Sequence, residues 1–359
     1  MTEDGRPVVI DSGALYTRVD FAGNDVPSVT VRTASETPVN GVSVETDPGR
    51  SAGAIPDWER LAGFWDSVLT ESLGTRAENQ PLLVVDWAES TKFSRELLAQ
   101  VAFETLGVPA LYLAAPAVLA LYAVNRTTGL SIDVGHTSLR IAPVYEGFQF
   151  GYATTTLPIG GIDIEARLRT LVLETHIGDA TTTRALDTLD WRVLKEAVSE
   201  VRPKQGVDGE TSTFTAKQYA VVEGRSILVT PDQYLGCTEM LFTPATSPDG
   251  KNRSTFTERV HLALMQCEPD IRRELAANIM LYGGGAALKG LAERLRSELV
   301  DVLPSSMHPN VAVAHDPSTV AWRGGSILAS ITMFQQLWVT KQDYNEHGPL
   351  CILRKDTMR

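Results

Sequence analysis

Apolar residues along the chain fall into short continuous runs that alternate with longer stretches in which an apolar residue recurs every three or four positions. Short runs are typical of buried strands, and the spaced stretches are typical of amphipathic helices. The expected strands, apart from hairpins, cover 82–86, 111–113, 278–282 and 311–313. The expected helices cover 56–69, 93–106, 116–122, 164–173, 191–201, 260–264, 270–277, 288–302 and 324–338. Strands that alternate with helices predict an α/β architecture with a mostly parallel sheet.

One short pattern occurs twice. Residues 8–19 read VVIDSGALYTRV, and residues 130–141 read LSIDVGHTSLRI. In both copies an apolar run ends in Asp-x-Gly, and a polar turn, an arginine and an apolar residue follow. Each copy predicts a strand–turn–strand hairpin with a carboxylate at the strand end beside a glycine turn. Two ordinary hairpins would give the same pattern, but the matching order of residues favours a duplicated unit.

The duplicated turns suggest a chemistry. Glycine in a turn lets backbone N–H groups approach an anion, and two facing turns can clamp a phosphate chain from both sides. Asp11 and Asp133 could then hold a hydrated Mg²⁺ against the phosphates, because Mg²⁺ keeps most of its waters and needs few carboxylates. A third turn, Gly283-Gly284-Gly285, leads from an expected strand into a helix, a position that also favours phosphate or nucleotide.

Composition and charge exclude several classes of function. The 359 residues have the length of two domains or of one bilobed domain. The net charge of −12 argues against direct nucleic-acid binding, which needs a basic face. No apolar run is long enough to span a membrane and the acidic first residues lack a signal segment, so we expect no membrane association. The three cysteines are far apart and fit a reducing compartment.

Several further stretches resemble actin. They are FAG at 21–23, RTTG at 126–129, PVYEG at 143–147, WRGGSILAS at 322–330, FQQ at 334–336 and KQDY at 341–344. Because the similarity covers nearly the whole chain, the sequence is identified as a member of the actin superfamily. The resemblance implies the bilobed α/β fold that actin shares with sugar kinases and chaperone ATPases, with two pseudo-symmetric domains around a nucleotide cleft.

The resemblance also implies boundaries within the chain. The first lobe would contain residues 1–125 and 315–359, with a second subdomain reduced to about 29–53. The second lobe would contain residues 126–314, with an insert subdomain at about 163–254.

The resemblance assigns a site for ATP or ADP with Mg²⁺. Asp11 and Asp133 match the water-mediated metal site. The residues that match nucleotide contacts are Asp11, Gly13, Arg18, Asp133, Gly135, Gly161, Arg192, Lys195, Glu196, Gly283 and Gly284. Arg192, Lys195 and Glu196 match purine and ribose contacts, and their spacing puts them on one helix face, although a solvated face would show the same spacing.

Departures from the family lie close to the phosphates. Ala14 and Leu15 replace a serine and a glycine in the first loop, and a left-handed backbone at Leu15 would cost roughly 1–2 kcal/mol. Pro116 stands where the family has a water-orienting glutamine, and proline has neither an amide side chain nor an N–H. Arg140 stands where the family has a histidine. Losing a positioning or proton-transfer group typically costs ~10²–10⁴ in rate, so we expect little or no ATP hydrolysis.

Other departures concern the base and the neighbouring loop. Leu288 and Ser318 replace the family's adenine-side tyrosine and lysine, which predicts weaker binding. Arg18 replaces a lysine and keeps the charge with a different shape. His136 lies in the second turn but not at the position of the family's histidine, and we expect it at the surface.

Two departures concern assembly. Actin's second subdomain, with its long loop, is cut down to about 29–53, and the loop that carries its hydrophobic plug aligns with the polar residues 244–251. Filament contacts need both. We therefore expect a non-polymerising actin-related protein that is a structural subunit of a larger complex, cytoskeletal or motor-associated, such as dynactin or the inner dynein arms of a flagellum. Its groove around Tyr122 and 327–331 would grip a partner helix.

The expected location is the cytoplasm and cytoskeleton, including a flagellar axoneme. Three alternatives remain open on the sequence. One is a chromatin-remodelling subunit in the nucleus. Another is a filament-forming actin with weak ATPase activity. The third is a sugar kinase on the same fold, which would use Asp133 as its catalytic carboxylate.

Overall fold

The computed structural model describes residues 5–33, 58–86, 91–175, 186, 189–204, 214–221, 226–243 and 254–354. Residues 34–53 of the reduced second subdomain and the polar stretch at 244–251 lie outside the described residues. The predictions made for those two segments therefore stay predictions.

The first sheet contains the first hairpin and has the strand order β14-β5-β4-β1-β2-β3. Its strands are β1 (Val8–Ser12), β2 (Tyr16–Phe21), β3 (Val29–Arg32), β4 (Leu82–Val85), β5 (Ala110–Ala114) and β14 (Val339–Thr340). Strands β1, β4 and β5 are parallel, whereas β2, β3 and β14 are antiparallel to their neighbours. The expectation of a mostly parallel sheet is therefore wrong, because each hairpin adds antiparallel pairs.

The second sheet repeats this plan with the order β13-β12-β6-β7-β8, and β9 pairs with β7. Its strands are β6 (Gly129–Val134), β7 (Leu139–Tyr145), β8 (Phe148–Gln149), β9 (Thr155–Leu157), β12 (Ile279–Tyr282) and β13 (Val311–Val313). Here too the first hairpin strand, β6, has a parallel neighbour on its other side. A separate pair, β10 (Lys217–Ala220) and β11 (Ser226–Val229), is antiparallel.

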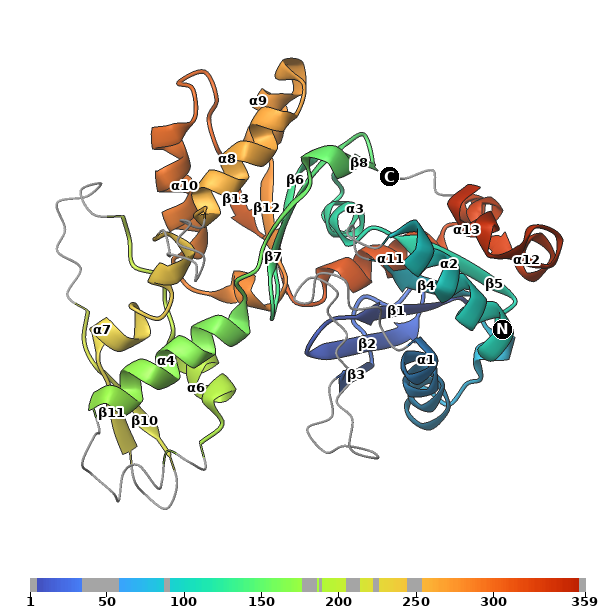
Figure 1. Ribbon diagram of the computed structural model, residues 1–359, viewed down its shortest axis with the longest axis horizontal. Helices are drawn as coiled ribbons and strands as arrows, with labels where there is room; N and C mark the ends of the chain where they lie inside the picture. The colour runs from blue at the N-terminus through green and yellow to red at the C-terminus, as the bar shows by residue number, and fades with distance from the viewer. Residues whose placement is uncertain are drawn as a thin grey trace.

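Helices cover these sheets (Figure 1). Their bounds are α1 Trp58–Ser67, α2 Lys92–Gln100, α3 Pro116–Tyr122, α4 Gly161–Thr175, α6 Trp191–Val198, α7 Pro231–Tyr234, α8 Phe256–Gln266, α9 Pro269–Ala277, α10 Leu291–Val302, α11 Val320–Ser330, α12 Lys341–His347 and α13 Cys351–Arg354. Within the described ranges, no helix is long and apolar enough to cross a membrane.

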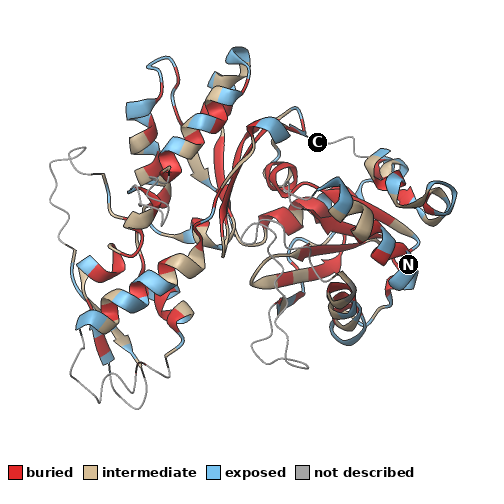
Figure 2. Ribbon diagram, viewed as in Figure 1, coloured by how far each residue is buried: buried red, intermediate tan, exposed pale blue. Residues whose placement is uncertain are grey.

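The side chains of β1 point alternately into two different cores, so the first sheet is buried on both faces (Figure 2). Val8 and Ile10 belong to the core that contains α1 and α2, whereas Val9 belongs to the core that contains Trp322 of α11. Successive side chains of a strand point to opposite faces, so a continuous apolar run suits a strand covered on both sides. The apolar runs that predicted β1, β4 and β12 have this cause.

Helices α3 and α11 lie between the two sheets (Figure 1). A Cβ atom at Gly324 of α11 would lie 1.9 Å from the carbonyl oxygen of Leu119 in α3, so only glycine allows this approach. The sequence prediction that Gly324 opens the last helix is wrong, because α11 begins at Val320 and its glycines serve packing. The same prediction put Ile327 and Ile331 on the apolar face, but they are 40% and 46% exposed.

Candidate functional site

The two copies of the duplicated pattern fold into hairpins with the same turn. In the first, the N–H of Gly13 donates to the carbonyl oxygen of Tyr16 at 2.9 Å. In the second, the N–H of Gly135 donates to the carbonyl oxygen of Ser138 at 3.0 Å. The predicted strand–turn–strand units are therefore confirmed, and the repeat extends to the hydrogen bond that closes each turn.

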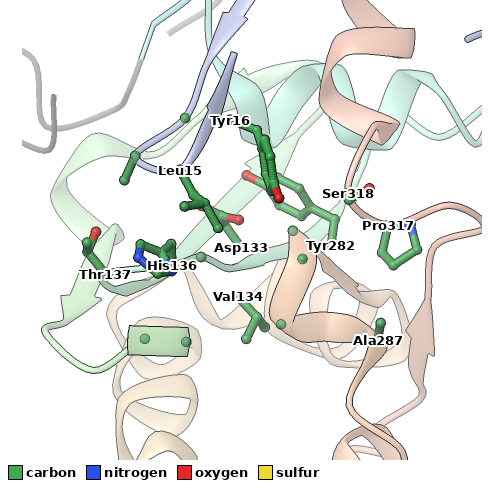
Figure 3. A pocket seen from close by; sticks show the side chains of 18 of the residues that line it. Leu15, Tyr16, Asp133, Val134, His136, Thr137, Tyr282, Ala287, Pro317 and Ser318 are labelled. Carbon is green, nitrogen blue, oxygen red and sulfur yellow. The ribbon is translucent and has the colours of Figure 1, made fainter. Parts of the chain in front are cut away.

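Both turns open onto one cavity of about 550 Å³. Figure 3 shows Leu15 and Tyr16 of the first hairpin beside Asp133, His136 and Thr137 of the second. The remaining walls come from the glycines after β12, residues 316–318 and the face of α6. The cavity is lined by every residue that the sequence assigned to nucleotide binding: Asp11, Gly13, Arg18, Asp133, Gly135, Gly161, Arg192, Lys195, Glu196, Gly283 and Gly284.

An arginine faces the aspartate in each hairpin. The register places Asp11 opposite Arg18 and Asp133 opposite Arg140. The Arg18–Asp11 separation is 3.8 Å and the Arg140–Asp133 separation is 3.5 Å. Burial raises the pKa of Asp11, and the positive charge of Arg18 opposes that shift only in part. Each turn therefore presents a largely buried pair of opposite charges to the cavity.

The glycine turn after β12 closes tightly on the second hairpin. Gly283 has a φ of +84°, and a Cβ atom there would lie 2.3 Å from Oδ1 of Asp133. Its N–H donates to the carbonyl oxygen of Pro317 at 2.7 Å, which fixes the turn to the loop before α11. Only glycine combines this left-handed φ with so close an approach. The turn thus brings bare backbone to the aspartate, as a phosphate-facing wall requires.

Helix α6 presents the predicted purine and ribose contacts. Asp190 caps its N-terminus by accepting hydrogen bonds from the N–H groups of Arg192 and Val193. Lys195 donates from Nζ to the carbonyl oxygen of Gly161 at 3.1 Å, while Glu196 has a side chain that is 56% exposed. The apolar face of the helix packs against α4 in the core that also contains the second sheet, so its polar face is held against the cavity.

Arg192 makes a contact that the sequence did not predict. Its Nη1 donates a hydrogen bond to the hydroxyl oxygen of Tyr16 at 2.6 Å. Tyr16 begins β2 in the first sheet, whereas α6 packs against α4 and belongs to the core that contains the second sheet. The hydrogen bond therefore joins the two sides of the cavity directly.

Several residues that departed from the family can now be placed. Leu15 does not adopt a positive φ, so the expected backbone cost does not arise. His136 is half-buried and lines the cavity, so its expected surface position is wrong. Pro116 is the first residue of α3 and is buried outside the cavity lining. Leu288 and Ser318 line the cavity.

Sequence reasoning also missed Tyr282 and Asp316, which line the cavity. Burial and the nearby negative charge of Asp133 hold the pKa of Tyr282 well above its usual value of 10.0. Tyr282 ends a predicted strand immediately before the glycine turn, so its position along the chain was a usable signal. Asp316 carried no such signal, because it follows a short strand and belongs to no motif.

The site fits a nucleotide better than it fits a magnesium ion. The cavity has the size of a small-molecule pocket, about 300–1,000 Å³, and glycines bring backbone close to it on several sides. Arg18, Arg140, Arg192 and Lys195 give it cationic groups suited to phosphate, beside the carboxylates of Asp11, Asp133, Glu196 and Asp316. In contrast, each carboxylate that would hold Mg²⁺ already has a guanidinium group within 4 Å.

Comparison with known protein families agrees with this architecture. The actin family model matches residues 2–357, nearly the whole sequence. Members of this fold family generally bind a nucleotide with Mg²⁺ in a cleft between two lobes. The chain therefore belongs to the actin family.

Proposed function

We propose that this protein is a non-polymerising member of the actin family that serves as a structural subunit of a multi-protein complex, cytoskeletal or motor-associated. It binds ATP or ADP in its cleft with little or no hydrolysis. It acts in the cytoplasm and cytoskeleton, including a flagellar axoneme. Its partners are protein subunits, with no direct contact to nucleic acid or membrane.

Nucleotide binding is supported by the convergence of three glycine turns on one cavity. The turns of both hairpins and the turn at 283–285 all line it, although they are far apart in the sequence. Asp11 and Asp133 would be the carboxylates beside a hydrated Mg²⁺. The guanidinium group next to each of them competes with that role.

Weak hydrolysis is supported by two residues that stand where the family has catalytic helpers. Pro116 is buried at the start of α3, and it has no side-chain amide to orient a water molecule. Arg140 is paired with Asp133 at 3.5 Å. A guanidinium group stays protonated at any physiological pH, so it cannot take a proton from water.

The role as a subunit is supported by exposed apolar residues beside α11. Ile327 is 40% exposed, Ile331 46% and Met333 81%. A monomer gains nothing from leaving neighbouring large apolar side chains in water, so such a surface favours a protein partner. The polar sequence at 244–251 supports the absence of self-assembly, because it offers no apolar plug to bury.

Sedimentation and phosphate release test this proposal together. The purified protein, incubated with Mg²⁺, salt and ATP beside conventional actin, should stay in the supernatant. It should also release phosphate at less than a tenth of the actin rate. Filaments in the pellet, or phosphate release equal to that of actin, would overturn the non-polymerising and non-hydrolysing parts respectively. Consumption of ATP that depends on a sugar would favour the kinase alternative.

The partner surface can be tested separately in native extracts. The wild-type protein should migrate in a complex much larger than its own 39.0 kDa. The double variant Ile327→Glu with Ile331→Glu should migrate as a monomer and still bind nucleotide. Val300→Glu is the matched control, since Val300 is 60% exposed on α10 and lies outside α11. A wild-type protein that migrates only as a monomer would count against a subunit role.

A further inference from the structure

We infer that the cleft binds its polyphosphate through arginines in place of a divalent cation, so that nucleotide binding does not depend on Mg²⁺. Arg18 and Arg140 supply the positive charge, one from each hairpin. This inference rests on the proposed function, because it requires the cleft to be a nucleotide site. It replaces the sequence-based expectation that Asp11 and Asp133 hold a metal ion.

The two arginines occupy equivalent places. Each follows its glycine turn and faces an aspartate across the hairpin. Both side chains are nearly buried, with 14% of Arg18 and 10% of Arg140 exposed, and both line the same cavity. A phosphate chain held between the turns would therefore meet a guanidinium group on each side.

Each cleft carboxylate already has a cation beside it. Arg18 is 3.8 Å from Asp11, and Arg140 is 3.5 Å from Asp133, so each pair has no net charge. A divalent cation beside either carboxylate would be repelled by the guanidinium group at similar distance. A polyphosphate would meet both arginines, whose guanidinium forks match phosphate oxygens in charge and geometry. The same two carboxylates oppose its binding, and their removal is tested below.

Another buried pair shows what distinguishes the arginines of the cleft. Arg95 and Asp86 have similar exposure, 13% and 5%, but lie outside the cavity lining. Their atoms are in direct hydrogen-bond contact at 2.9 Å. The distances in the two cleft pairs exceed that of a direct hydrogen bond. The cleft arginines thus lie near their aspartates and line the cavity in which a phosphate chain would lie.

The direct test is the affinity for ATP, measured by calorimetry on the full chain in Mg²⁺ and again in EDTA. Inorganic tripolyphosphate is the second probe, because it carries the anionic chemistry without the nucleoside. We expect the affinity for each probe to change less than fivefold between the two conditions. A loss of fivefold or more in EDTA would overturn the inference and leave the proposed nucleotide site intact. No ATP binding in either condition would overturn both.

Removing the carboxylates should change the affinity for ATP in opposite directions, depending on whether the arginines or a metal ion hold the phosphates. In the double variant Asp11→Asn with Asp133→Asn, the arginines remain and the competing negative charges are gone. We expect ATP to bind in EDTA at least as tightly as to the wild type. If the aspartates hold a metal ion, the same variant should bind ATP less tightly in Mg²⁺, and that result would refute the inference.

A charge-neutral replacement tests the arginine itself. The variant Asp133→Asn with Arg140→Gln removes one cleft pair without leaving a buried charge, and it should lose at least tenfold in ATP affinity in EDTA. Asp86→Asn with Arg95→Gln is the matched control and should keep wild-type affinity. Thermal unfolding of both variants shows whether they fold. Equal affinity of the folded cleft variant and the control would overturn the role of Arg140.

Discussion

The hydrogen bond between Arg192 and Tyr16 makes a specific prediction about how the cleft opens. The donor lies on α6, which belongs to the core that contains the second sheet, and the acceptor begins β2 of the first sheet. Any motion that separates the two sides must break this contact. The variant Tyr16→Phe removes only the hydroxyl and keeps the ring beneath the guanidinium carbon, 5.9 Å from the ring centre.

The size of the effect follows from the surroundings of Arg192. A hydrogen bond to a charged group contributes about 1.5–3 kcal/mol when its partner has no substitute. Here the Arg192 side chain is 18% exposed and also approaches Asp190 at 3.4 Å and Glu196 at 3.6 Å. Water and these carboxylates replace part of the lost interaction, so we expect a loss of about 1 kcal/mol in the closed state. That corresponds to about fivefold in the opening equilibrium.

The assay is the release rate of a fluorescent ATP analogue, chased with excess ATP. Release from Tyr16→Phe should be about fivefold faster than from the wild type, with little change in the midpoint of thermal unfolding. Tyr152→Phe is the matched control, because its hydroxyl also binds a charged partner, Glu268 at 3.0 Å, away from the cavity. Equal release rates in wild type and Tyr16→Phe would show that the hydrogen bond does not hold the cleft closed.

The remaining predictions concern stability. Gly324→Ala should lower the free energy of unfolding by about 3 kcal/mol or more in urea titration, because its Cβ atom meets the backbone of Leu119. Gly63→Ala should instead raise it by about 0.5–1 kcal/mol, since that glycine is exposed in α1 with open space around it. Burial raises the pKa of Glu200, but the hydrogen bond and charge of Lys217 outweigh it and hold the pKa below 4.5. The stability that wild type has over Glu200→Gln should therefore be present near pH 7 and shrink as pH falls below about 4.5.

Local interactions explain what the sequence could predict. The hairpin turns, the strand at β4 and the helix that begins at Pro116 all depend on residues that are neighbours in the chain. The spacing of Asp11 and Arg18 around a glycine turn also sets their cross-strand pairing. That pairing could have been derived from the sequence alone, because a turn closed by Gly13 and Tyr16 fixes the register.

Tertiary contacts explain what the sequence could not predict. The role of Gly324 depends on the approach of α3, more than two hundred residues earlier in the chain, so its pattern was interpreted as a helix start. The contact of Arg192 with Tyr16 joins residues 176 positions apart. This contact depends on how the two sheets are placed relative to each other, and the periodicity of apolar residues along the chain does not specify that placement. His136 was assigned to the surface for the same reason, because the wall that half-buries it comes from other elements.

The two arginines of the cleft occupy the same register position in the two hairpins, and together they indicate a phosphate site that neither would indicate alone. One arginine opposite an aspartate in a hairpin would be an ordinary cross-strand pair, and such pairs are common. Here the same residue types recur at the same register position in both hairpins, and the two pairs open onto one cavity. A polyphosphate between the turns would be held by both guanidinium groups at once. Binding of ATP without Mg²⁺ should therefore require Arg18 and Arg140 together. Replacing either arginine–aspartate pair should lower the affinity for ATP in EDTA nearly as far as replacing both pairs.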